Sequence, residues 1–130
     1  MLDNKTKDMK KLFAFLLILC ISSFSFGQEN QATAKGNETS FKEQVAKGVI
    51  TFTLPAASTA ESVKKNSAYY TKFFTVDFDA TSKNAVISMI DNTEESRHVI
   101  VRFLISNKVR TVKLGNTEYT VSEFYEKHLK

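Results

Sequence analysis

Two aspartates and a threonine near the middle of the chain have a spacing that could support phosphoryl-transfer chemistry. Asp77, Asp79 and Thr81 form a D-x-D-x-T pattern directly after an apolar stretch. Some phosphatases use such a pair at a strand end, one carboxylate as the nucleophile and the other as a general acid or base. Only about fifty residues follow the pair, which is too few for the rest of such an enzyme. We therefore interpret Asp77 and Asp79 as solvent-facing carboxylates that precede a turn.

Residues that could bind a metal ion or act as a nucleophile are scarce. His98 and His128 are the only histidines, and Cys20 is the only cysteine. Without paired cysteines or a His-x-x-x-His spacing, the chain has no pattern typical of a transition-metal site. No serine carries the flanking glycines of a nucleophile elbow, although a Ser–His–Asp arrangement assembled by the fold stays open. We expect no catalytic residue, no metal-binding residue and no cofactor, and we predict that the protein is not an enzyme.

Residues 1–27 have the pattern of a signal peptide. Four lysines precede the apolar run 12–21, and Ser25 and Gly27 are small residues at the −3 and −1 positions of a cleavage site. The run is shorter than the roughly 20 apolar residues of a membrane-spanning helix. Lipidation of Cys20 is disfavoured because Leu19, and not a small residue, precedes it. We predict an exported protein, periplasmic or secreted, with no stable membrane anchor after cleavage.

Removing this leader changes the composition on which functional inferences rest. The remaining 103 residues suffice for one small domain, and their net charge is +2, compared with +4 for the whole chain. The basic balance is therefore weak support for nucleic-acid binding. Basic and aromatic residues do mix over 64–73, but export argues against a nucleic-acid partner. The remaining chain has no cysteine and can form no disulfide, so its stability must come from its apolar core.

Residues 28–48 are predicted to be a flexible N-terminal linker. The stretch 28–40 is polar and lacks large apolar side chains, so burial cannot offset the entropy of ordering it. The stretch 41–47 is ambiguous. Ser40 with Glu43 resembles a helix capping box and Gly48 a residue that ends a helix, whereas an extended lead-in to the next strand fits nearly as well.

From residue 49 onward the apolar pattern predicts an α+β domain that extends to residue 130. Strands are expected at 49–54, 74–78, 84–90 and 109–114, and helices from Ser58 or Thr59 to about 70 and from Asp91 or Asn92 to about 104. The order β-α-β-β-α-β is typical of a ferredoxin-like sandwich, an antiparallel sheet with two helices on one face. A hairpin at Gly115-Asn116, a fifth strand and a helix capped by Ser122 complete the chain. The residues expected to be buried are Phe52, Val63, Phe74, Val76, Phe78, Ile100 and Leu104.

The segment from the first predicted strand to the fourth resembles the heavy-metal-associated (HMA) domain family. The resemblance lies in the spacing from Val63 to the apolar residues Phe73, Val76 and Phe78, and in the strand–turn–strand stretch 75–86. HMA domains carry a Met-x-Cys-x-x-Cys loop between the first strand and the first helix. In this chain, Ala56 and Thr59 stand at the positions of the two cysteines. Since paired thiolates select copper(I) and similar ions, the resemblance implies a degenerate domain without the family's metal-transfer chemistry.

These observations together predict an exported, non-catalytic binding or interaction module with an unknown envelope protein as its partner. The possible contact loop is the one at the place of the family's metal loop, Pro55, Ala56, Ala57, Ser58 and Thr59. A threonine-rich outer sheet face, with Thr51, Thr53, Thr75 and Asp77, is expected to be solvated. The alternatives are an envelope metal-handling protein with weak non-thiolate binding, or a small enzyme accessory.

Overall fold

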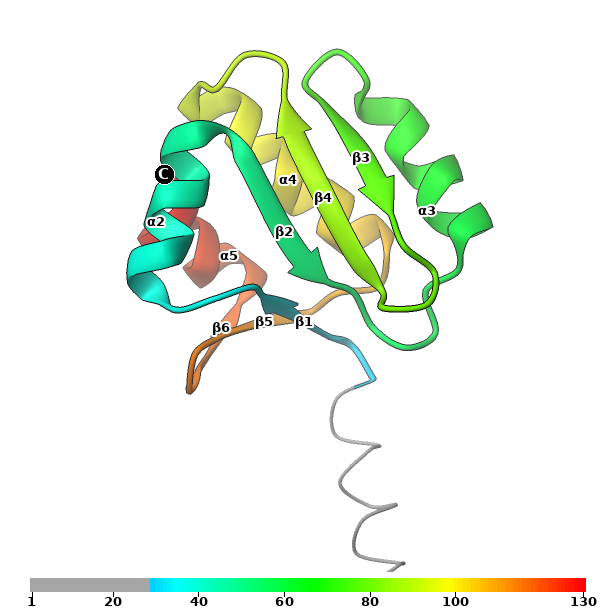
Figure 1. The fold of residues 1–130 in the computed structure, drawn as a ribbon, viewed down its shortest axis with the longest axis horizontal. Coiled ribbons are helices and arrows are strands. Elements are labelled where there is room, and N and C mark those ends of the chain that lie inside the picture. The colour runs from blue at the N-terminus through cyan, green and yellow to red at the C-terminus, as the bar shows by residue number, and fades with distance from the viewer. Residues whose placement is uncertain (1–28) are drawn as a thin grey trace, which may run out of the picture.

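A computed structural model of the protein describes residues 29–130, so the predicted signal peptide lies outside the described residues. The chain forms an α+β domain built on one six-stranded sheet (Figure 1). The strands are β1 (Gln31–Ala34), β2 (Val49–Thr53), β3 (Phe74–Phe78), β4 (Asn84–Met89), β5 (Thr111–Leu114) and β6 (Thr117–Thr120). The helices are α2 (Glu38–Lys47), α3 (Ala60–Ser67), α4 (Glu94–Ser106) and α5 (Val121–Phe124), with a 3₁₀ turn η1 (Ala68–Tyr70) and a π-helix η2 (Tyr125–Leu129). Over the described range, no helix combines the length and apolar character needed to cross a membrane.

The strand order is β3-β4-β2-β1-β5-β6, and the pairing is antiparallel except between β1 and β5, which are parallel. The predicted α+β class is confirmed, as is the hairpin that joins β3 to β4. The predicted antiparallel sheet is wrong, since the sheet has six strands and is mixed: β1 was not predicted, and it pairs parallel with β5. The finer ferredoxin-like order is not confirmed, because β1 lies between β2 and β5.

The prediction of a flexible linker over 28–48 is wrong for most of that range, because residues 31–34 form β1 and residues 38–47 form α2. Ala32 and Ala34 alternate with Gln31 and Thr33, and both alanines are buried in the sheet. Small side chains at these central positions leave room for the helix layer, so the strand lacks the large apolar residues that would have revealed it. β1 is hydrogen-bonded through its backbone to both β2 and β5. This pairing holds the strand in place, although its small side chains bury little apolar surface.

The α2 helix begins and ends with local caps. Asn37 is the N-cap: its side-chain oxygen accepts a hydrogen bond from Ser40 N–H at 2.8 Å, and Ser40 Oγ accepts one from Asn37 N–H at 2.9 Å. This reciprocal pair replaces the capping box predicted between Ser40 and Glu43. Gly48 ends the helix in the left-handed region, with φ of 74°, as its sequence position indicated. Phe41 is fully buried and anchors α2 to the core.

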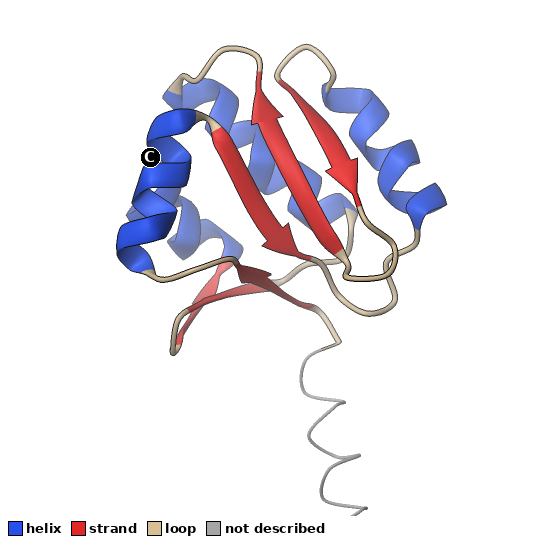
Figure 2. Ribbon diagram, viewed as in Figure 1, coloured by secondary structure: helices blue, strands red, loops and turns tan. Residues whose placement is uncertain are grey.

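The helices pack on one face of the sheet, and the other face is uncovered. In Figure 2 no helix lies over the near face of β2, β4 and β3. Inward side chains alternate with outward ones, and the largest buried side chains are aromatic, namely Phe41, Phe52, Phe74, Phe103 and Phe124. On the uncovered face, Thr53 Oγ1 donates to Asn84 Oδ1 at 2.7 Å, and Thr75 and Asp77 are exposed.

Most of the predicted core is confirmed, but the end of β3 is not. Phe52, Phe74 and Leu104 are buried, as are Val63 and Ile100. By contrast, Val76 and Phe78 are only half-buried and pack at the margin of the core. The sheet order gives the reason. β3 is an edge strand, so side chains along it have cover from fewer neighbours than those of β2 or β4.

The C-terminal elements also differ in detail from the prediction. Gly115 adopts a φ of 60° in the predicted hairpin turn between β5 and β6. The helix that follows is capped by Thr120, whose Oγ1 accepts from Glu123 N–H at 3.2 Å, and not by Ser122. After one α-helical turn the chain widens into the π-helix η2, in which Lys130 N–H donates to Tyr125 O at 2.9 Å. Isolated π-helical turns are rare, and they often lie at functional sites.

Candidate functional site

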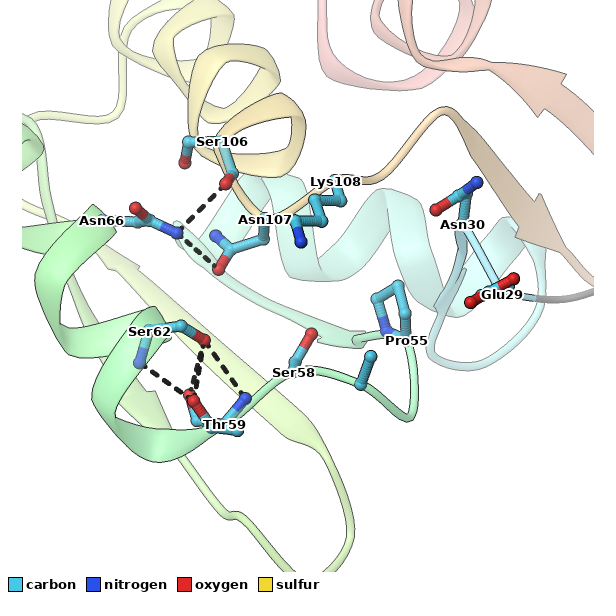
Figure 3. A pocket seen from close by; sticks show the side chains of 11 residues that line it. Glu29, Asn30, Pro55, Ser58, Thr59, Ser62, Asn66, Ser106, Asn107 and Lys108 are labelled. Atoms are coloured by element: carbon cyan, nitrogen blue, oxygen red, sulfur yellow. Dashed lines mark hydrogen bonds between the residues drawn. The ribbon is translucent and has the colours of Figure 1, made fainter.

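A small polar pocket lies at the C-terminal end of β2, beside the loop that leads into α3 (Figure 3). Its volume is about 240 Å³. Four parts of the chain enclose it: the β2–α3 loop, the first turns of α3, the end of α4, and the residues that precede β1. The lining residues are Glu29, Asn30, Pro55, Ala57, Ser58, Thr59, Ser62, Asn66, Ser106, Asn107 and Lys108.

The β2–α3 loop is held by backbone hydrogen bonds and by one lysine. Ser58 N–H donates to Pro55 O at 2.9 Å, which closes a tight turn directly after the strand. Lys83, from the β3–β4 hairpin, donates its Nζ to Ser58 O at 2.7 Å, and its own carbonyl accepts from Leu54 N–H at 2.8 Å. The hairpin therefore buttresses the loop at both its start and its middle.

The α3 helix starts at the edge of the pocket with a complete capping box. Thr59 Oγ1 accepts from Ser62 N–H at 3.1 Å, and Ser62 Oγ accepts from Thr59 N–H at 3.1 Å. The sequence predicted a cap at Ser58 or Thr59, and Thr59 is the one that forms it. Because the two hydroxyl groups bond each other and the backbone, they serve first to fix the direction in which α3 leaves the loop.

The opposite wall is an amide network that joins α3 to the end of α4. Asn66 Nδ2 donates to Ser106 O and to Asn107 Oδ1, both at 3.1 Å. Asn107 Nδ2 in turn donates to Phe103 O at 2.8 Å, and Asn107 is only 7% exposed. Lys108 follows with a φ of 65° and turns the chain towards β5. A buried amide and a half-buried amide that satisfy each other in this way hold the wall in one arrangement.

Ser58 is a buried pocket residue whose hydroxyl the described part of the fold does not use in a hydrogen bond. It is 7% exposed, and its hydroxyl makes no hydrogen bond with any residue from 29 to 130. Figure 3 shows the hydroxyl pointing from the loop into the space below the end of α4. The charged side chains of the lining are Glu29 and Lys108, so the formal charge of the pocket is zero. The arrangement offers hydrogen bonds to a neutral polar group.

The predicted contact loop is mostly, but not wholly, part of this pocket. Pro55, Ala57, Ser58 and Thr59 line it, whereas Ala56 is exposed and lies outside the lining. Sequence reasoning missed the second wall, formed by Asn66, Ser106, Asn107 and Lys108. The one signal in the sequence was the Asn-Lys pair after an apolar helix, which is typical of a helix end. Nothing in that signal indicates that the helix end faces residues 55–59.

The other residues singled out in the sequence lie elsewhere. Asp79 Oδ1 accepts from Thr81 N–H at 2.9 Å and so shapes the β3–β4 turn, while Asp77 is exposed on the open sheet face. His98 stacks on Tyr125 with ring centroids 4.2 Å apart. His128 lies against aromatic rings of the core, including Phe124 at 5.2 Å. Over residues 29–130, the structure brings no three His, Cys, Asp or Glu side chains into a group that could hold a metal ion.

Comparison of the chain with protein-family models, with curated proteins and with solved structures finds no match.

Proposed function

We propose that the protein is a non-catalytic binding module whose polar pocket takes a short neutral segment of a protein partner. The observation that carries this proposal is the Ser58 hydroxyl, which belongs to a buried residue, points into the pocket and has no partner within residues 29–130. A ligand that reaches such a recessed group loses water around the contact, so the hydrogen bond contributes more than one on an open surface.

The size and lining of the pocket favour a peptide over a metabolite. About 240 Å³ is below the 300–1,000 Å³ usual for small-molecule sites, and it suits one or two residues of an inserted chain. The lining contains no aromatic ring on which a sugar or a base could stack. Hydroxyl and amide groups match the N–H and C=O groups of a peptide backbone, and the zero formal charge favours an uncharged segment.

The position of the pocket agrees with the resemblance noted in the sequence. We propose that β2, α3, β3, β4, α4 and β5 form an HMA-like, ferredoxin-like unit into which β1 is inserted. The order of these elements along the chain supports this view. The contact loop would then occupy the place of the family's metal loop, with Ala56 and Thr59 where cysteines would stand. The leader pattern in residues 1–27 supports an envelope protein as the partner.

The two adjacent alanines of the loop provide a matched test. Both alanines are exposed, but Ala57 lines the pocket and Ala56 does not, so Ala57→Trp adds a large side chain at the pocket and Ala56→Trp adds the same side chain outside the lining. Peptides would be selected from a random display library on the immobilised protein, and their affinities measured by isothermal titration calorimetry. We expect Ala57→Trp to abolish binding and Ala56→Trp to preserve it. Ser58→Ala should weaken binding roughly tenfold, because one hydrogen bond is lost.

Several outcomes would contradict the proposal. Selected peptides that bind Ala57→Trp as tightly as the unmodified protein would show that the pocket is not their site. If none of the selected peptides binds Ser58→Ala more weakly than the unmodified protein, the Ser58 hydroxyl does not contribute to binding, which contradicts the proposal. Thermal unfolding of both tryptophan variants serves as the control, since a loss of fold would make the comparison of affinities meaningless.

A further inference from the structure

We infer that the protein has a second binding site, a basic cleft beside α2 that takes a phosphate group. The cleft is separate from the polar pocket, because the two linings have no residue in common. Its volume is about 440 Å³. The charged residues that line it are Glu38, Lys42, Arg97, Lys127 and Lys130, so four cations face one carboxylate.

Arg97 is the fixed element of the cleft. Its Nε donates to Leu129 O at 2.6 Å, and its Nη1 donates to Asn92 Oδ1 at 2.8 Å and to Asn92 O at 3.2 Å. These acceptors are neutral oxygens, so they orient the guanidinium without cancelling its charge. Nη2 makes no hydrogen bond within residues 29–130. A guanidinium held in this way is preorganised for an oxyanion, whose oxygens match its planar array of N–H donors.

The network behind Arg97 ties together the elements that form the cleft. Asn92 Nδ2 donates to Val45 O at 2.8 Å and to Ala46 O at 3.3 Å, which fastens the β4–α4 loop to the end of α2. Arg97 joins the same loop to the π-helix η2 through Leu129 O. The three elements are therefore linked before any ligand arrives, so a bound anion need not order them.

Two of the three lysines of the cleft form no ion pair within residues 29–130. Lys130 forms an ion pair with Glu126 at 3.3 Å, the one ion pair found within residues 29–130. Lys42 and Lys127 thus have no carboxylate partner in that part of the chain, and Lys127 Nζ lies 5.4 Å from the centroid of the Tyr119 ring. Like charges gathered in one cleft repel, and a bound anion relieves that repulsion. Apolar walls, here including the buried Phe41, focus the field of such charges.

A phosphate group is the ligand chemistry that fits best. A phosphate group is tetrahedral and presents several negatively charged oxygens in different directions. One group can therefore accept hydrogen bonds from a guanidinium and from two ammonium groups at the same time. The group could belong to a soluble phosphate compound or to the headgroup of an anionic lipid. The same residues would recognise either source, and the experiment has to separate them.

The test uses the protein with two charge-matched pairs of substitutions. Lys42→Gln with Lys127→Gln removes two cations of the cleft, whereas Lys64→Gln with Lys65→Gln removes two exposed cations of α3, outside the cleft. Binding of inorganic phosphate is measured by NMR titration at low ionic strength. Binding to phosphatidylglycerol vesicles, with phosphatidylcholine vesicles as reference, is measured by co-sedimentation. We expect the cleft pair to weaken binding at least tenfold and the α3 pair to leave it within twofold.

The two arms decide the source of the phosphate group. Binding of inorganic phosphate that depends on Lys42 and Lys127 assigns the site to soluble phosphate compounds, and vesicle binding with the same dependence assigns it to lipid headgroups. An Arg97→Lys variant, which keeps the charge but loses the planar fork, should also weaken binding in the arm that is positive. Absence of binding in both arms overturns the inference. Equal weakening by the cleft pair and the α3 pair overturns it as well, because net charge alone would then account for the binding.

Discussion

The polar pocket and the basic cleft differ in what holds their binding groups in place. In the pocket, the buried Asn107 and its partner Asn66 form a wall that also ends α4, so the site and the fold share the same hydrogen bonds. In the cleft, the lysines are exposed, and within residues 29–130 Arg97 is the one charged lining residue that main-chain oxygens hold in place. Changes in the pocket wall should therefore alter stability together with binding. Changes to the cleft lysines should alter binding alone.

The largest expected effect comes from the core beneath the cleft. Phe41 is fully buried, and its ring contacts those of Phe52 at 5.9 Å and Phe124 at 5.3 Å. Phe41→Ala should lower the free energy of unfolding by about 3–5 kcal/mol, through lost burial and a cavity. Urea denaturation followed by circular dichroism measures the change. Phe78→Ala, at the half-buried end of the edge strand, is the control and should cost clearly less. A loss below about 1 kcal/mol for Phe41→Ala would show that Phe41 does not anchor α2 to the core, and would contradict the description of α2 as a fixed wall of the cleft.

A smaller effect is expected from the wall of the polar pocket. Asn107→Ala removes an amide that is 7% exposed and leaves Asn66 with one acceptor fewer. We expect a loss of about 1–3 kcal/mol in the free energy of unfolding. A double-mutant cycle with Asn66→Ala measures the coupling between the two side chains directly. Strictly additive losses would mean that the two amides act independently, and the pocket would then lack the rigid wall described above.

The two regions also differ in how far the sequence predicted them. Ile50, Phe52 and the threonines between and after them show the alternation of a half-buried strand, so β2 was predicted correctly. The segment 31–47 was missed because β1 uses Ala32 and Ala34 in place of large apolar residues. Its order depends on pairing with β2 and β5, which are distant in sequence. The local amino-acid composition cannot reveal that a segment pairs with strands that are distant in the sequence.

The same reasoning explains the sites. The loop residues 55–59 were singled out through the resemblance to HMA domains, which carry their metal loop between the first strand and the first helix. The amide wall and Arg97 could not be singled out, because each acquires its role from a contact across more than thirty residues of chain, such as Asn66 with Asn107 or Arg97 with Leu129. Sequence periodicity identifies which face of an element is buried, but not which polar groups meet at its end.

The smallest expected effect concerns pH. Burial lowers the pKa of His128 below its ordinary 6.5, the nearby Lys127 lowers it further, and Glu38 acts in the opposite direction. The folded protein therefore binds fewer protons than the unfolded chain just below pH 6.5, so the free energy of unfolding falls as the pH drops from 7 through the depressed pKa. His128 Nε2 is buried without a partner among the described residues, so protonation gains no compensating hydrogen bond.

The thermal midpoint of unfolding, recorded between pH 5 and pH 7.5, checks this dependence. His128→Phe, which keeps a ring against Phe41, Tyr119 and Phe124, should flatten the profile in that window. If the thermal midpoint of His128→Phe depends on pH as steeply as that of the unmodified protein, another group is responsible for the dependence. If the midpoint rises on acidification, protonation of His128 does not destabilise the fold as its lowered pKa predicts.

The most direct test of the binding-module account is a ¹H–¹⁵N NMR titration of the protein with a peptide selected on it. The backbone amides of Ser58, Asn66 and Asn107 should shift together and saturate at one common affinity, while those of Lys42, Arg97 and Lys127 stay in place. Shifts confined to the basic cleft, or spread over the open face of the sheet around Thr51 and Thr75, would contradict the assignment of the polar pocket as the binding site.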